Sequence, residues 1–171
     1  CLLYWRGISC LSHDLGESRI FFEKAFHTFN VTGDDAGALL AWAGIVEAIS
    51  ILNERYADLD PWIGWLDGMM GAGLCFPSLE LEAQVVPQML IALTLRQPDN
   101  PRISLWSRRT EALMRTRAFD VADRIVFATY LMGYYFILGY YNNADSLLRE
   151  MRPLVGEKKT PPVIFLKWQF A

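Results

Sequence analysis

The sequence predicts an all-α fold, a right-handed solenoid of about four helical hairpins. Apolar residues recur at helical spacing almost throughout, and no segment alternates apolar and polar residues as a half-buried strand would. The breaks between the expected helices also recur, at intervals of about 42 residues. Because a unit of two helices cannot bury its apolar faces alone, such units stack into a curved array with a concave binding side.

The composition is that of a folded chain of 171 residues, 53% of them apolar. This length suits a single domain with a sizeable core, and Trp, Tyr and Phe supply large side chains for it. We expect residues 1–171 to form one helical-repeat domain. The initial Cys1 and the apolar run Val163 to Ala171 indicate a fragment of a longer protein.

The first two hairpins are predicted from apolar stripes and from the residues between them. In the first, a break at Gly16 separates two helix faces, formed by Tyr4, Ile8, Leu11 and Leu15 and then by Phe22, Ala25, Phe26 and Phe29. In the second, one helix begins near Asp35. The segment from Asp58 to Pro61 then supplies a cap and a first-turn proline for the next helix, which carries Trp62, Ile63, Leu66 and Met70.

The third hairpin begins at Ser78, an expected N-cap, and its second helix opens at Asn100. Pro87 lies inside the first of these helices, where its ring clashes with the carbonyl four residues earlier. We therefore expect a short break or a marked kink at this position.

The fourth hairpin starts at Asp120, turns near Gly139 and resumes at Ala144, and Pro161–Pro162 opens a fifth helix. Residues 125–144 carry no charge and are long enough to cross a bilayer. Five tyrosines, two asparagines and the lack of a comparable second segment favour a buried helix of a non-membrane array over a span.

Two sets of breaks agree on the period. First helices start near Asp35, Ser78 and Asp120, which are 43 and 42 residues apart. Second helices start 44, 40 and 42 residues apart, near Gly16, Asp60, Asn100 and Asn142. A repeat of this length is typical of stacked helical hairpins.

The fourth hairpin resembles the tetratricopeptide repeat (TPR), with its signature spacing at Leu131, Tyr135, Gly139, Ala144 and Leu148. In that motif the glycine permits the turn and the small alanine lets the helices approach closely. The first hairpin matches at Ile8, Gly16 and Ala25 but has Phe21 in place of the small residue.

The repeats exceed the usual 34 residues of that family. The chain is therefore similar to the longer TPR-like arrays of large bacterial signal-transducing transcriptional activators, of the maltose-activator and BTAD-containing types. The resemblance implies a cytoplasmic regulatory segment between an ATPase module and a DNA-binding module. Such a segment senses an inducer or holds the regulator inactive.

Recognisable catalytic and cofactor motifs are absent from the sequence, which has no glycine-rich phosphate loop, H-E-x-x-H, G-x-S-x-G or zinc-type Cys/His spacing. We expect no enzyme activity, no cofactor and no metal. Glu23 and His27 have the i, i+4 spacing of a metal or proton-relay pair, but a solvated surface pair is favoured. The three cysteines favour a reducing, cytoplasmic compartment, and Cys10 and Cys75 are expected to be inert in apolar packing.

Candidate partner-binding residues come from the fourth hairpin. Phe127, Tyr130, Tyr134 and Ile137 lie off the stripe assigned to packing within that hairpin. First helices line the concave side of such arrays, so Tyr130 and Tyr134 are candidates to face a ligand, with packing between repeats as the alternative. The ligand would be a protein partner, another domain of the parent chain, or a small-molecule inducer.

Charge is divided unevenly along the chain. Residues 1–95 hold four basic and twelve acidic side chains, and residues 96–171 hold twelve and seven. Arg102, Arg108, Arg109 and Arg115 form two strips at i, i+7 spacing. They are either an ordinary solvated face or a docking surface for an acidic region of another domain or of a second copy. The pI of about 5.4 argues against direct nucleic-acid binding.

Overall fold

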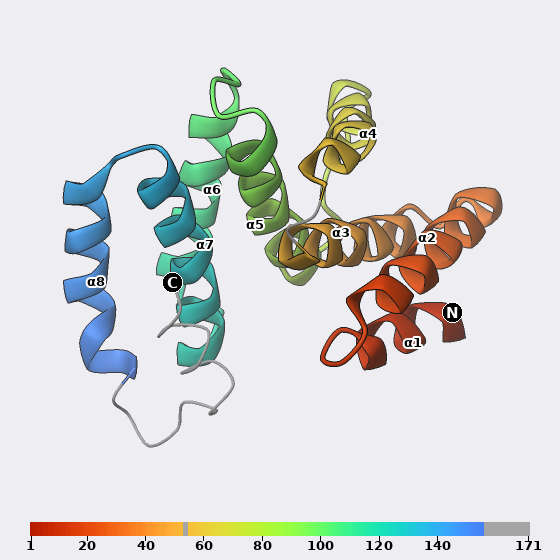
Figure 1. Ribbon diagram of the computed structural model, residues 1–171, viewed down its shortest axis with the longest axis horizontal. Helices are drawn as coiled ribbons and strands as arrows, with labels where there is room; N and C mark the ends of the chain where they lie inside the picture. The colour runs from red at the N-terminus through yellow and green to blue at the C-terminus, as the bar shows by residue number, and fades with distance from the viewer. Residues whose placement is uncertain (53–54, 156–171) are drawn as a thin grey trace.

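The computed structural model describes residues 1–52 and 55–155, and within these ranges the protein is helical throughout with no strand (Figure 1). The predicted all-α class is confirmed. The helices are α1 (Leu2–Cys10), α2 (Leu15–Thr32), α3 (Asp35–Leu52), the short 3₁₀ helix η1 (Tyr56–Leu59), α4 (Asp60–Gly71), α5 (Leu79–Arg96), α6 (Ile103–Arg115), α7 (Val121–Ile137) and α8 (Tyr141–Val155). The expected fifth helix at Pro161–Pro162 lies outside the described residues.

Odd-numbered helices contact one another in succession, α1 with α3, α3 with α5 and α5 with α7. The helices α2, α6 and α8 pack instead on their neighbours in sequence, and α4 packs on η1 and α5. Figure 1 shows α5, α6, α7 and α8 side by side, with α3 running across their direction. The row α3, α5 and α7 therefore presents one continuous face.

Side-chain caps set several helix starts, as predicted. Ser78 accepts a hydrogen bond from the backbone N–H of Leu81 at the start of α5, and Asp120 accepts one from Asp123 at the start of α7. The predicted helix start near Gly16 is confirmed to within one residue, but Gly16 itself does not form the break. Asp14 caps the backbone N–H of Glu17, so α2 begins at Leu15 and Gly16 lies in its first turn.

The start of α4 differs from the expectation in one respect. Pro61 lies in the first turn as predicted, but no side chain caps this helix, and η1 leads directly into it. Asp58 instead pairs with Arg19 of α2 over 2.7 Å. The Asp58 carboxylate, which was expected to cap α4, therefore forms an ion pair with α2 instead.

Helix α5 passes through Pro87 without a break, so the predicted break is wrong, and the alternative of a marked kink stays a prediction. Proline has no N–H, and the carbonyl oxygen of Ala83 therefore lacks the donor it would have in a regular helix. Most neighbours of Pro87 are buried between α3, α6 and α7. Packing on several sides keeps the helix continuous despite this lost bond.

The uncharged residues 125–144 form two helices rather than one. Gly139 adopts a left-handed conformation, with φ of 76°, and the backbone N–H of Tyr140 donates to the carbonyl of Tyr135 over 2.8 Å. The predicted turn is confirmed. Within the described ranges, α3 is the one helix whose length and apolarity suit a membrane span, and most of it is buried in the fold.

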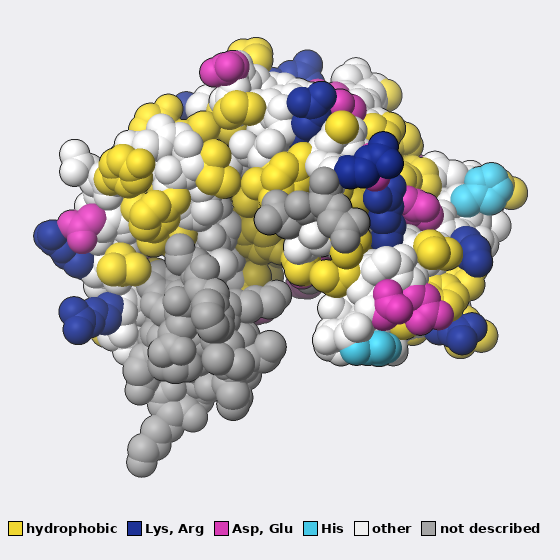
Figure 2. Space-filling view, viewed as in Figure 1, with side chains coloured by type: hydrophobic (Ala, Val, Ile, Leu, Met, Phe, Trp, Pro, Cys, Tyr) yellow, Lys and Arg dark blue, Asp and Glu magenta, His cyan; other side chains and the backbone are white. Residues whose placement is uncertain are grey.

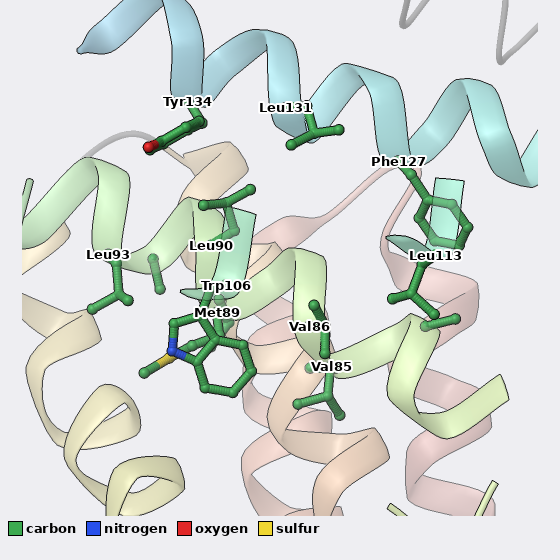
Figure 3. Packing of buried hydrophobic residues seen from close by; sticks show 14 of the residues in the cluster. Val85, Val86, Met89, Leu90, Leu93, Trp106, Leu113, Phe127, Leu131 and Tyr134 are labelled. Atoms are coloured by element: carbon green, nitrogen blue, oxygen red, sulfur yellow. The ribbon is translucent and has the colours of Figure 1, made fainter. Parts of the chain in front are cut away.

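The core is continuous from α2 to α8. Figure 3 shows apolar side chains of α5 directed toward Trp106 and Leu113 of α6 and toward Phe127, Leu131 and Tyr134 of α7. At the other end, the fully buried ring of Phe22 lies against Gly7 of α1 and Gly44 of α3. Any side chain at either glycine would meet this ring, so close helix approach depends on both.

Candidate binding site on the α3–α5–α7 face

Two adjoining pockets lie on the face shared by α3, α5 and α7, with volumes of about 270 and 290 Å³. Both are lined by Glu47 of α3, Gln88 of α5, and Val126 and Tyr130 of α7. Figure 2 shows hydrophobic side chains in the middle of this view, at the place of α5 in Figure 1. Successive odd-numbered helices therefore build one recessed surface.

The smaller pocket, called the Gln88 pocket below, combines apolar walls with a few polar groups. It is lined by Glu47, Ser50, Ile51, Gln88, Ile91, Val126, Thr129 and Tyr130. Such a lining is typical of sites for small molecules or single side chains.

Gln88 is the central polar group of this pocket. Its side chain is buried, with 6% exposed, and its Nε2 donates a hydrogen bond to the Tyr130 hydroxyl over 2.6 Å. Among the described residues, neither Gln88 Oε1 nor the buried Ser50 Oγ has a hydrogen-bond partner. Buried polar atoms are nearly always satisfied, so these two unmet oxygens distinguish the lining residues of this pocket.

The larger pocket, called the Pro87 pocket, continues toward the start of α7. Besides the four shared residues it is lined by Glu80, Ala83, Gln84, Pro87, Phe119, Asp123 and Phe127. Ala83, whose carbonyl receives no helix hydrogen bond because residue 87 is a proline, is therefore one of the residues that line this pocket. The same proline that weakens the α5 backbone contributes to the binding face.

The charge of this face is negative. Glu47, Glu80 and Asp123 line it, and none of its described lining residues is Lys, Arg or His. Burial first, and then the negative charge of Glu47, raise the pKa of Tyr130, so its hydroxyl keeps its proton. Burial also raises the pKa of Asp123, with a further rise from Asp120.

The two predicted tyrosines have different surroundings. Tyr130 lines both pockets, whereas Tyr134 is 6% exposed and packs in the core beside the rings of Tyr135 and Tyr140. Figure 3 shows Tyr134 next to Leu90 of α5. The structure therefore brings Tyr130 to the recessed face and places Tyr134 among packing residues. Phe127 lines the Pro87 pocket, and Ile137 is exposed.

The four predicted arginines lie on α6 or at its start, away from this face. Arg102 pairs with Asp67 over 2.9 Å, and Arg109 pairs with Glu82 over 2.7 Å. The guanidinium of Arg109 also stacks over the ring of Phe76. These two side chains therefore bind acidic residues of the N-terminal half of the same chain.

The other two arginines differ in their contacts. Arg115 pairs with Glu111 over 2.8 Å and approaches Glu150 of α8 at 3.9 Å, beside a separate pocket of about 260 Å³. Arg108 is exposed, and no ion pair is recorded for it within the described ranges. Of the four, Arg108 is thus the one that combines exposure with no ion pair among the described residues.

Other candidates from the sequence show ordinary packing. Glu23 pairs with Arg19 over 2.8 Å, and the described part of the chain contains no cluster of three metal-ligating side chains. Cys10 is buried beside Glu17, and burial first, then Glu17, raise the pKa of its thiol. Cys75 is exposed, so the expectation that it packs in apolar surroundings is wrong.

Sequence reasoning missed Glu47, Ser50 and Gln88. A signal was present for two of them, because Glu47 interrupts the apolar run from Asp35 to Leu52, and Gln88 interrupts another from Val85 to Leu93. A charged or amide side chain inside such a run must find a polar environment. The sequence offers no comparable signal for Ser50.

Comparison with known proteins found no matching family model, no similar curated protein and no similar solved structure. The resemblance to TPR-like arrays therefore stays a prediction.

Proposed function

We propose that this chain is a non-catalytic interaction and regulatory scaffold, whose α3–α5–α7 face binds a partner. The observation that carries this proposal is the buried Gln88 amide, which lines a pocket built by three successive odd-numbered helices with its oxygen unbonded. A surface assembled in this way from repeated units is how helical arrays bind their partners.

The helix contacts support a right-handed, TPR-like solenoid as the setting of this face. In such arrays each first helix packs on the next first helix, and the second helices form an outer layer. The contacts of α1 with α3, α3 with α5 and α5 with α7 have this form. The resemblance to bacterial signal-transducing activators adds the proposed setting, a cytoplasmic segment of a transcriptional regulator.

Exposed apolar side chains on the outermost helices agree with stacking on further units. Leu2 and Trp5 of α1 are exposed, as are Phe136 of α7 and Tyr141 and Leu148 of α8. Figure 2 shows hydrophobic side chains on the α8 side of the molecule. Further repeats of a helical array would pack on such end helices.

Differential capture tests the scaffold function. Val126→Trp places a large ring at a residue that lines both pockets, while Ile20→Trp makes the same kind of change on an exposed position of α2. Immobilised wild-type protein and both variants are exposed to the same lysate, and captured proteins are quantified by mass spectrometry. We expect at least one protein to be retained by wild type and Ile20→Trp and lost with Val126→Trp. Identical capture by all three would contradict the proposal.

A second candidate function is a sensor of a small-molecule inducer. The size of the Gln88 pocket favours it, because about 270 Å³ is close to the lower end of small-molecule sites. Thermal-shift screening with sugars and metabolites tests it. A ligand at about 100 times its dissociation constant stabilises the folded state by about 2.7 kcal/mol, and that stabilisation should disappear in Val126→Trp.

A further inference from the structure

We propose that the Gln88 pocket binds a primary ammonium group carried on a flexible apolar stem. Both an alkylamine and a lysine side chain have this chemistry. The inference rests on the binding face proposed above, and it adds the chemical class of what that face holds.

Hydrogen-bond acceptors are the first reason. An ammonium group has three N–H donors and no acceptor. Among the described residues, Gln88 Oε1 receives no hydrogen bond while its Nε2 donates to Tyr130, and the buried Ser50 Oγ is also unbonded. Two side chains that line the pocket therefore each carry an unmet oxygen, which suits a group that carries only donors.

Charge is the second reason. The carboxylate of Glu47 lines the Gln88 pocket, and those of Glu80 and Asp123 line the adjoining Pro87 pocket. With no Lys, Arg or His among the described lining residues of either pocket, the recess attracts cations and repels anions. Hydrogen bonds from an ammonium to these oxygens are charge-assisted and stronger than neutral ones.

The apolar walls are the third reason. Ile51 of α3, Ile91 of α5 and Val126 of α7 line the same pocket as the polar groups. A straight hydrocarbon stem buries its surface against such side chains while its charged end reaches the oxygens. The ring of Tyr130 adds an aromatic surface, against which a cation is favourable.

Titration calorimetry with n-pentylammonium chloride tests this ligand class on the wild-type chain. Pentan-1-ol is the control with the same stem and no charge, and sodium pentanoate is the control with the opposite charge. We expect pentylammonium to bind about tenfold more tightly than either, with affinity falling as salt rises.

Paired variants locate the site. Glu47→Gln and Gln88→Met each remove a polar group of the pocket with little change of size, and each should weaken pentylammonium binding by about tenfold or more. Glu23→Gln is the matched control, because it removes a carboxylate from α2, where Glu23 pairs with Arg19. It should leave binding unchanged. Circular dichroism checks folding, and Glu47→Gln carries the test if Gln88→Met does not fold.

A second ligand separates the two sources of the ammonium group. Nα-acetyl-lysine methylamide carries the same charged stem on a blocked peptide backbone. If it binds more tightly than pentylammonium, the natural ligand is a lysine of a polypeptide. If pentylammonium binds and the lysine derivative does not, the ligand is a free small amine.

Equal binding of pentylammonium and pentan-1-ol, or no binding of either amine, would overturn the proposed ligand class. Equal loss of binding in Glu47→Gln and Glu23→Gln would overturn the assignment to this pocket. The capture experiment with Val126→Trp distinguishes these failures from failure of the scaffold function. If a captured protein is lost only with Val126→Trp, the α3–α5–α7 face binds a partner even though its ligand is not an ammonium group.

Discussion

Gln88 of α5 donates a hydrogen bond to the hydroxyl of Tyr130 of α7 over 2.6 Å, which joins two successive odd-numbered helices at the centre of the recessed face. Tyr130→Phe removes the acceptor and keeps the ring. Because the Gln88 amide is buried and would lose its partner, we expect the free energy of unfolding to fall by about 1–3 kcal/mol. Urea denaturation measures this, with the exposed Tyr141→Phe as control. Equal midpoints for the two variants would show that the bond contributes nothing.

Tyr130 also predicts a dependence of stability on alkaline pH. Burial, and secondarily Glu47, hold its pKa in the folded protein above the ordinary value of 10.0. Above that pH an unfolded tyrosine ionises while folded Tyr130 stays neutral, so the unfolded state binds fewer protons and stability falls as pH rises. The stability contribution is fully present below about pH 10. The alkaline decline in unfolding midpoint should be shallower in Tyr130→Phe than in wild type, and parallel curves would argue against this origin.

Gly44 predicts the cost of crowding at the end of the core near α1. A Cβ at this position would lie 2.7 Å from the ring of Phe22, which is fully buried and also touches Gly7. Gly44→Ala should lower stability by about 1–3 kcal/mol, despite the better helix propensity of alanine. Gly68→Ala in α4 is the matched control, because nothing lies within 4 Å of its Cβ, and it should leave stability unchanged or higher. Thermal unfolding that ranks the two variants in the opposite order would refute the prediction.

Ala144 tests the TPR-like approach of α7 and α8. Its side chain is 4% exposed, and Leu131 of α7 is buried in the same core. Ala144→Trp should overpack this contact and cost about 1–3 kcal/mol or more, while Leu148→Trp on the exposed side of α8 should cost little. Chemical denaturation compares the two. A neutral Ala144→Trp would mean that the helices do not approach closely there.

Arg108 and Arg109 separate two roles for the arginine strips. Arg108→Glu reverses an exposed charge and should leave stability unchanged while weakening any salt-sensitive association of the chain. Arg109→Glu places a carboxylate beside Glu82, and it should lower stability by about 1 kcal/mol or more. Sedimentation at low and high ionic strength and thermal unfolding provide the two measurements. Association that is unaffected by both salt and Arg108→Glu would leave Arg108 with a solubility role only.

Local chemistry explains which helix boundaries were predictable. Ser78 and Asp120 cap the helices that follow them, and Gly139 makes the turn that its freedom at positive φ permits. The Gly16 break failed because Asp14, two residues earlier, caps the helix first. Pro87 does not interrupt α5, because burial on several sides outweighs one lost backbone bond, and no local pattern reports such burial.

The candidate site was harder to predict because it is built by residues far apart in sequence. Tyr130 was a candidate from its helix face, but its hydrogen-bond partner Gln88 lies 42 residues away. The partners of Arg102 and Arg109 are likewise distant, at Asp67 and Glu82. Charge asymmetry between the halves of the chain left two interpretations of the arginines, a solvated face or a docking surface for an external acidic region. It did not predict that Arg102 and Arg109 would pair with acidic residues of the same molecule.

The recessed face also has a mechanical consequence, because each of its three walls belongs to a different helix of the row α3, α5 and α7. An occupant that touches all three walls sets the spacing between neighbouring helices on that face. In a stack of helices, a small change of spacing on one side alters the angle at which the neighbouring helices pack. Filling or emptying a pocket of about 270 Å³ would therefore act on the packing of three helices at once.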